Sequence, residues 1–400
     1  PTHTHHVCRR QRQMCIRDRL FTAQVDYELP LGSTSIFETG IKVSRIDSES
    51  VLDQFIFEND LKEEDFENSN VFLYDETNYA AYASYSKNWD KWQLKVGVRS
   101  EHTEIEGNSL STNTKNKNDY LKFFPSVNIT RTLTESSEVY FRYNRRIYRP
   151  RYSDLNPFKF FLNDNTFISG DPNLRPEIDD SFIAGYTFNK NSTIEAFYRY
   201  ENDPTIQITF QENENKLLKR VNTNIDRNIS YGLDFMTYAS VLKNWNVYVL
   251  SSLFYFENNY FAIESNNELR KNDKWNFYAQ VINYFNLLDD NSLNLNLSYT
   301  YISPVVDGPQ IVSERSGLNI NLVKNLWNNR ASINLGVTDI FNTQNFSTSL
   351  DYLNQDVYLA SRMENRLFTF GFNYKFGNFR LKDNKKEIEL NERERLENSN

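Results

Sequence analysis

Apolar and polar residues alternate over long stretches of this chain. Residues 293–301 read Leu-Asn-Leu-Asn-Leu-Ser-Tyr-Thr-Tyr, so every odd position is apolar or aromatic and every even position is Asn, Ser or Thr. Similar alternation returns at residues 92–101, 139–144 and 368–376. A period of two places one chemistry on each face of a strand. The pattern therefore predicts many long β-strands, each with one apolar and one polar face.

Short turns and long polar segments divide these strands in strict rotation. The turns are rich in Asn, Asp, Gly and Ser, as hairpin turns are. They lie near residues 30–33, 88–91, 132–136, 189–192, 242–246, 287–291 and 325–330. Seven turns join fourteen strands, the first near residues 20–29, and a last strand near 366–377 makes fifteen. Long polar segments, including 104–120 and 148–177, separate the hairpins and are expected to be loops.

Strands with one apolar and one polar face suit an antiparallel β-barrel in a membrane, whose outside meets lipid and whose inside meets water. We therefore expect an all-β protein, a transmembrane antiparallel β-barrel with about fifteen strands in this chain. Complete bacterial barrels have an even number of strands and periplasmic termini, so the odd count predicts a fragment. A soluble propeller or sandwich is the alternative, but it would have shorter strands and a fixed repeat.

Composition agrees with a membrane barrel. Charged residues make up 24% of the chain and the mean hydropathy is −0.67, so no apolar run is long enough for a transmembrane helix. Barrel strands hide their apolar character in every second residue, so this does not exclude a membrane. Aromatic residues at 15% suit the girdles at both lipid–water interfaces. The net charge of −8 argues against a nucleic-acid partner.

The two ends of the chain differ from the rest. Residues 1–19 hold both cysteines and three of the four histidines, and such a cluster could bind a metal. The alternative, which we favour, is a non-native segment translated from adapter or cloning sequence. Residues 20–377 are then the partial outer-membrane β-barrel, and residues 378–400 a charged periplasmic tail.

Catalytic chemistry has little support in this sequence. Outside the first nineteen residues there is no cysteine and one histidine, His102, in the segment 99–103 where a strand is expected to enter a loop. A Ser-His-Asp site would need His102, and a solvated histidine at the rim is the simpler interpretation. Acidic runs such as 63–65 and 179–180 could bind calcium, but their spacing matches no known loop. We expect no enzyme, no cofactor and no metal site.

The densest chemical feature is the segment 143–177, which opens with a cluster of arginines at the outer end of a strand. The cluster consists of Arg142, Arg145, Arg146, Arg149 and Arg151. By alternation, Arg142 and Arg146 face the lumen. Guanidinium groups there could hold an anionic solute or an acidic plug.

An alternative for these arginines is pairing with carboxylates of neighbouring strands, such as Glu101 and Glu177, which would only stiffen the wall. Both interpretations stay open. Arginine and aromatic side chains can also grip siderophores or sugars on a loop. The candidates for such a loop contact are Tyr148, Arg149, Arg151 and Tyr152.

The same segment resembles the barrel of TonB-dependent receptors from Bacteroidetes-type bacteria. The resemblance rests on a strand ending in Arg-Arg and Arg-Pro, a Leu-Asn-Pro-Phe stretch and a Gly-Asn-Pro-x-Leu-x-Pro-Glu turn. These appear here as Arg145-Arg146, Arg149-Pro150, Leu155-Asn156-Pro157-Phe158 and the run Gly170 to Glu177, with Asp171 in place of the usual Asn. Residues 97–103 are similar to the family's Gly-x-Arg-x-Glu-x-Thr strand, and residues 337–342 match near the end. The resemblance covers about residues 20–397.

The resemblance implies a C-terminal barrel fragment of a TonB-dependent outer-membrane receptor that takes up a bulky solute such as a siderophore or a glycan. Family barrels have twenty-two strands, which would make the first strand here the eighth and leave out seven strands, the plug, the TonB box and the signal peptide. The implied partners are outer-membrane lipid, the TonB complex through the plug, the barrel assembly machinery and a surface lipoprotein. The alternatives are an adhesin or passive pore without TonB coupling, and an outer-membrane hydrolase that depends on His102.

Overall fold

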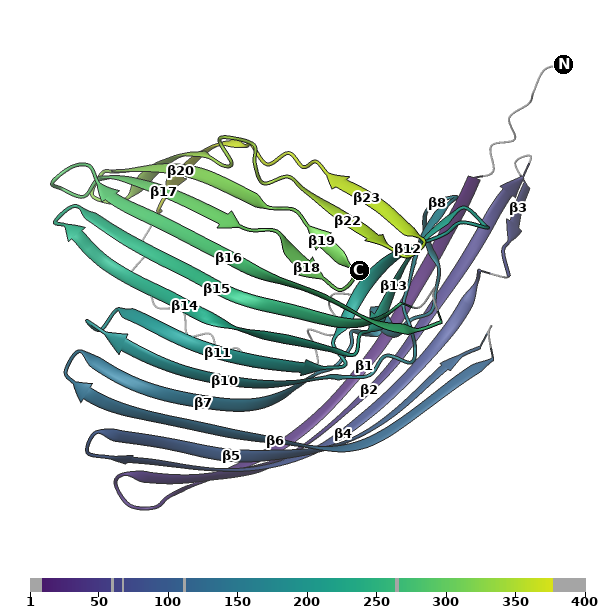
Figure 1. Ribbon diagram of the computed structural model, residues 1–400, viewed down its shortest axis with the longest axis horizontal. Helices are drawn as coiled ribbons and strands as arrows, with labels where there is room; N and C mark the ends of the chain where they lie inside the picture. Colours follow the sequence, from purple (N-terminus) through teal and green to yellow (C-terminus); the bar gives the residue numbers. More distant parts are fainter. Residues whose placement is uncertain (1–8, 59–60, 67, 111–112, 263–265, 377–400) are drawn as a thin grey trace.

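The computed structural model describes residues 9–58, 61–66, 68–110, 113–262 and 266–376, and it consists almost entirely of antiparallel strands (Figure 1). The main sheet has sixteen strands, of which β3 pairs only with β2 and the other fifteen follow one another in chain order. The fifteen are β1 (Arg9–Pro30), β2 (Ser35–Glu58), β4 (Asn70–Trp89), β5 (Trp92–Ser109), β6 (Thr114–Thr134), β7 (Ser137–Tyr148), β10 (Glu177–Phe188), β11 (Ser192–Asn202), β14 (Arg227–Leu242), β15 (Trp245–Ala262), β16 (Glu268–Asn286), β17 (Leu293–Ile302), β20 (Arg315–Leu326), β21 (Ala331–Val337) and β24 (Phe368–Tyr374).

This path confirms the predicted fold class and the fifteen strands. The sheet curls strongly (Figure 1), and β1 and β24 stand at the two ends of the path. No pairing between these two strands occurs within the described residues. No helix in the described part of the chain has the length and apolar character needed to cross a membrane.

The short connections gather at one end of the sheet, at the left in Figure 1, and their positions are those predicted. Several of their residues adopt a left-handed backbone, including Asp90 (φ 45°), Asn189 (φ 51°) and Asn291 (φ 54°). Asn and Asp tolerate this conformation better than other residues with side chains. The Asn and Asp residues at these places therefore explain why the chain reverses within so few residues.

The longer connections lie at the opposite end and contain structure of their own. The only helix in the described part of the chain, α1 (Tyr152–Leu155), is one of these elements. The loop strands are β3 (Leu61–Glu64), β8 (Phe160–Asn163), β9 (Thr166–Ser169), β12 (Thr205–Glu212), β13 (Leu217–Asn224), β18 (Val305–Asp307), β19 (Gln310–Val312), β22 (Phe346–Tyr352) and β23 (Gln355–Ser361). Apart from β3, which pairs with β2, they form two four-stranded sheets, β12-β13-β9-β8 and β18-β19-β22-β23.

The two faces of the main sheet differ as the alternation predicts. The outward face carries many exposed apolar side chains, such as Val25 at 67% and Leu253 at 50% exposure. On the same face of β15, Trp245 stacks on Phe285 near the turns, and Tyr255 contacts Trp275 about ten residues further along. A tilted strand crosses a bilayer in about 9–11 residues. The two aromatic clusters therefore have the separation of the two interfacial girdles.

Strand β1 begins earlier than the sequence pattern indicates. It starts at Arg9, and its early residues pair in register with β2, for example Cys15 with Val51 and Ile16 with Ser50. A long neighbouring strand offers a row of backbone donors and acceptors, and pairing with them does not require alternation. The predicted boundary at residue 19 thus falls inside a strand. The non-native origin of residues 1–19 stays a prediction; residues 1–8 and the tail 378–400 lie outside the described residues.

Candidate functional site

The loop between β7 and β10 folds within the curve of the sheet and packs against β2 and β4. Its short helix α1 buries Tyr152 and Leu155. The Tyr152 ring meets the Tyr74 ring of β4 edge-on, with 4.9 Å between their centres, a favourable geometry for two aromatic rings. The resulting buried cluster contains Ile46, Leu52, Phe72, Tyr74, Tyr152, Leu155, Phe158 and Leu174. This cluster anchors the loop to the inner wall.

The two halves of this loop are also tied to each other through their backbones. The Gly170 N–H donates to the Asn156 carbonyl (3.0 Å), and the Asp171 N–H donates to the Asp154 carbonyl (2.8 Å). A Cβ atom on Gly170 would lie only 2.2 Å from the Asp154 oxygen, so this approach is open to glycine alone. The Leu-Asn-Pro-Phe stretch and the glycine turn therefore form one compact unit.

Arg149 joins this unit to the wall through a buried ion pair. Its side chain is only 12% exposed, and Nη2 lies 2.5 Å from Oε2 of Glu101 and 3.0 Å from the Thr103 hydroxyl. Its Nε lies 3.7 Å from Oε1 of Glu76 on β4. Glu101 also accepts a bond from Arg99 at 2.5 Å. The Arg-Pro motif and the Gly-x-Arg-x-Glu-x-Thr strand are thus in direct contact.

The charge on Arg149 is maintained by these neighbours. Burial acts to lower the pKa of Arg149, but Tyr120, Glu101 and Glu76 together raise it above the ordinary value. A buried charge that keeps its partners is tolerated, whereas removal of one partner leaves the other charge uncompensated. Arg149 is therefore a structural clamp between the loop and the wall.

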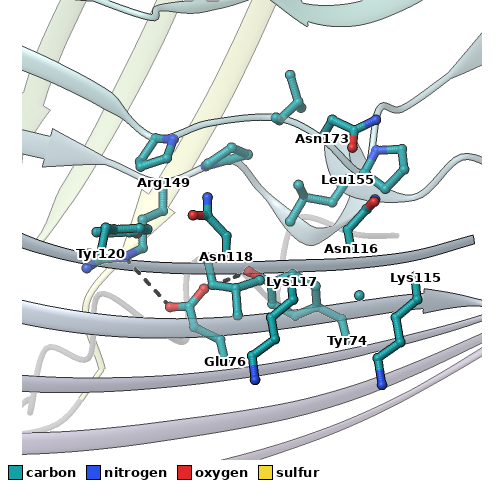
Figure 2. Close-up of a pocket in the computed structure, with 16 residues that line it drawn as sticks. Tyr74, Glu76, Lys115, Asn116, Lys117, Asn118, Tyr120, Arg149, Leu155 and Asn173 are labelled. Carbon is teal, nitrogen blue, oxygen red and sulfur yellow. Dashed lines mark hydrogen bonds and ion pairs between the residues drawn. The ribbon is translucent and has the colours of Figure 1, made fainter.

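A cavity of about 340 Å³ lies between this loop and strands β4, β5 and β6 (Figure 2). Prolines and leucines of the loop form one side, and Tyr and Asn side chains of the strands form the other. Its lining includes Tyr74, Glu76, Ile105, Gly107, Asn116, Asn118, Tyr120, Arg149, Pro150, Leu155, Pro172, Asn173, Leu174 and Pro176. The side chains of Lys115 and Lys117 border it but point away (Figure 2).

A lining that combines apolar side chains with converging polar groups is found in ligand sites. The acid and the base in this lining, Glu76 and Arg149, lie near each other (3.7 Å). The other polar groups are neutral amides and phenols, from Asn116, Asn118 and Tyr120 among others. The cavity therefore offers hydrogen bonds and apolar contact more than a net charge.

The predicted arginine cluster does not form one site. Arg142 lies 3.9 Å from Glu195 and places its guanidinium over the Tyr140 ring. Arg146 stands opposite Asp179 in the β7–β10 register. These contacts are the kind expected from the wall-stiffening interpretation.

Arg145 lies on the other face of β7, 3.7 Å from Asp180. Arg151 is exposed just before α1, where its carbonyl accepts bonds from the Asp154 and Leu155 amides. Tyr148 is exposed, whereas Tyr152 is buried in the cluster that anchors the loop. Of the seven residues predicted as ligand contacts, only Arg149 lines the cavity.

The sequence pattern did not identify the strand side of the cavity because residues 104–120 were expected to form a loop. In the structure β5 continues to Ser109 and β6 begins at Thr114. Asn116, Asn118 and Tyr120 occupy alternate positions of β6 and share its inner face. The spacing of two between these residues is the feature of the sequence that could have indicated a strand here.

The family described as "Outer membrane protein beta-barrel family" matches residues 9–374. No protein of curated function matches the chain.

Several solved structures share the fold at low sequence identity. The copper transporter OprC aligns with a TM-score of 0.65 and 10% identity, over 91% of this chain and 57% of that one. The siderophore receptor PiuA from Acinetobacter baumannii gives 0.61 and 12%, over 91% and 56%. The ferric yersiniabactin uptake receptor FyuA from Yersinia pestis gives 0.59 and 15%, over 92% and 55%. The chain thus spans just over half the length of these proteins, and the likeness shows a common fold.

Proposed function

Because this chain belongs to the outer membrane protein beta-barrel family and is located in the outer membrane, we propose that it forms the C-terminal part of the wall of a TonB-dependent receptor. The receptor takes up a bulky solute, such as a siderophore or a glycan, across the outer membrane. Catalysis has no part in this proposal. The Bacteroidetes-type origin indicated by the motifs stays a prediction.

The observation that carries the proposal is the loop held inside the curve of the sheet. A buried apolar cluster and the Arg149–Glu101 pair fix this loop against the wall. The loop and the wall then frame a cavity at the end of the barrel that carries the long connections. Outer-membrane barrels direct their long loops to the outside of the cell, so the cavity would meet solutes as they arrive.

The two edge strands of the main sheet indicate that the complete barrel wall contains further strands. Strands β1 and β24 each pair on one side within the described residues, and unpaired backbone groups are costly in lipid. Seven further strands would complete a barrel of twenty-two. This chain covers only 55–56% of the solved siderophore and ferric yersiniabactin receptors that share its fold.

The partners follow from the same proposal. A plug domain inside the completed barrel would contact the TonB complex, and its movement would open a path to the periplasm. The barrel assembly machinery would insert the protein into the outer membrane. A surface lipoprotein would fit over the long loops.

The test compares growth of the bacterium that carries the gene with growth of two deletion strains, one lacking this gene and one lacking TonB. Each strain receives a panel of ferric siderophores as sole iron source and of oligosaccharides as sole carbon source. The proposal expects both deletions to abolish growth on the same solute. Growth that requires this gene but not TonB would identify a passive pore, and growth unaffected on every solute would favour an adhesin; either result would overturn the proposal.

A further inference from the structure

The outward face of β5 and β6 carries a group of three potential metal ligands. His102 lies in the middle of β5, which continues to Ser109, so its predicted position at the start of a loop is wrong. Glu104 is the next residue on the same face of β5, and Asp119 belongs to β6. This face is opposite to the one that holds Arg149 and the cavity.

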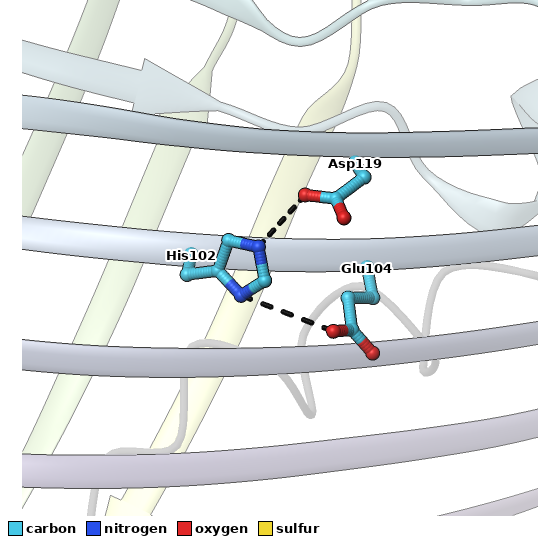
Figure 3. A group of neighbouring side chains, drawn as sticks. All are labelled: His102, Glu104 and Asp119. Atoms are coloured by element: carbon cyan, nitrogen blue, oxygen red, sulfur yellow. Dashed lines mark hydrogen bonds and ion pairs between the residues drawn. The ribbon is translucent and has the colours of Figure 1, made fainter.

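The three side chains converge (Figure 3). Nε2 of His102 lies 2.7 Å from Oδ1 of Asp119, and Nδ1 lies 4.0 Å from Oε1 of Glu104. One ligand atom from each residue can be chosen so that all lie within 4.8 Å of one another. The His102 ring is stacked on Tyr79 of β4, with 6.3 Å between centroids and 23° between planes. This stacking restricts the orientation of the imidazole.

The strand register supplies a second, independent observation. Glu104 stands directly opposite Asp119 in the β5–β6 pairing, and like charges at directly opposite positions destabilise a sheet. The nearby lysines are placed beside a different carboxylate, that of Glu106. Lys115 lies 2.5 Å from Glu106, and Lys117 stands opposite Glu106 in the strand pairing. Both carboxylates face the His102 ring, with Asp119 in hydrogen-bond contact with it, and a cation bound there would offset the repulsion between Glu104 and Asp119.

We propose that His102, Glu104 and Asp119 bind a divalent transition-metal ion of the zinc class. Imidazole and carboxylate together are ligands for such ions, whereas calcium and magnesium prefer oxygen ligands alone. Zinc–ligand bonds are about 2.0–2.2 Å long. Because Asp119 faces Nε2 of His102 and Glu104 faces Nδ1, one exposed carboxylate would rotate toward the nitrogen that holds the ion. Three protein ligands leave a coordination position open for water.

The site lies at the outer border of the apolar band. Trp92 begins β5 at the end of the sheet with the short turns, and His102 follows about ten residues later on the same face, which is the length of a tilted strand across a bilayer. The ligands are between 38% and 58% exposed. The ion would therefore exchange freely with water outside the membrane.

The experiment measures protection of His102 from diethyl pyrocarbonate by zinc chloride, in the full chain in detergent micelles. Peptide mass spectrometry reads His102 separately from His3, His5 and His6, which could bind zinc themselves. The matched variants are Glu104→Gln and Asp119→Asn at the site, and Glu106→Gln, two residues further along the same face, as the control.

We expect zinc to protect His102 in the parent and in Glu106→Gln, and magnesium not to protect it. In Glu104→Gln and Asp119→Asn, half-protection should need at least about tenfold more zinc, because even outer partners of metal ligands contribute tenfold or more to affinity. Absence of zinc protection in the parent would overturn the proposal. Equal protection in all variants would also overturn it, because His102 alone would then bind the zinc.

Discussion

Nη2 of Arg149 lies 2.5 Å from Oε2 of Glu101, and this contact joins the loop after β7 to the inner face of β5. The two residues are far apart in sequence and belong to two different motifs. Their pairing explains why the loop occupies the inside of the curved sheet.

Replacing Arg149 by Ala should release the loop from the wall. Glu76 and Glu101 would lose their common buried partner, although Arg99 would stay beside Glu101, and breaking a buried ion pair typically costs about 3–5 kcal/mol. Hydrogen exchange at the Gly170 and Leu174 amides, both hydrogen-bonded within the loop, measures the free energy of this opening. Arg145→Ala is the control, because Arg145 is more exposed than Arg149 and lies 3.7 Å from Asp180, so this pair should contribute less than about 1 kcal/mol. Equal effects of the two variants would contradict the clamp.

Replacing Gly170 by Ala should separate the two halves of the loop. The new methyl group would collide with the Asp154 carbonyl, and overpacking of this kind costs about 1–3 kcal/mol. The Asp171 amide, which donates to that carbonyl, should exchange correspondingly faster. Gly371→Ala is the control, since its added Cβ has 3.6 Å to the nearest atom. Unchanged exchange at Asp171 would show that the backbone contact does not hold the loop.

Filling the cavity should block solute binding. Asn118→Trp places a large side chain into the space between β6 and the loop, and on the proposed function it should reduce binding of the transported solute by more than about tenfold. Lys117→Trp is the matched control, because that side chain points away from the cavity (Figure 2). The measurement is solute binding to whole cells that carry each variant. Normal binding by Asn118→Trp would place the binding surface elsewhere.

The loop should be held more tightly in mild acid than at neutral pH. Burial raises the pKa of Asp154 above its ordinary value of 3.8, although the Arg151 backbone, the Arg151 charge and Ser153 act in the opposite direction. The docked loop therefore binds the proton more tightly than the released loop does. The stability that this provides is present below the ordinary pKa and is lost as the pH rises through the raised one.

Asp154→Asn removes this titration. The opening free energy of the loop, from amide exchange corrected for intrinsic rates, should fall as the pH rises from about 4 in the parent and stay flatter in the variant. A parent profile as flat as that of the variant would show that Asp154 is equally solvated in both states.

Local pattern predicted the wall well and the site poorly. The number, order and facing of the fifteen strands follow from a period of two and from turn residues such as Asp90 and Asn189, which act within a few positions. The loop unit depends on contacts such as Gly170 with Asp154 and Arg149 with Glu101. These contacts arise when distant segments pack together, and no periodic signal marks them. Alternation of apolar and polar residues did not predict the extension of β5 and β6 through residues 104–120, because polar residues fill both faces there.

Residues 101–104 of β5 contribute to two separate groups of side chains on opposite faces of the strand. Glu101 and Thr103 point inward to Arg149, while His102 and Glu104 point outward to Asp119. Loss of a single residue at this point would exchange the faces of the rest of the strand. It would turn the imidazole toward the loop and the carboxylate that clamps Arg149 toward the exterior. The spacing of these four residues therefore fixes the chemistry of both faces of the wall at the same time.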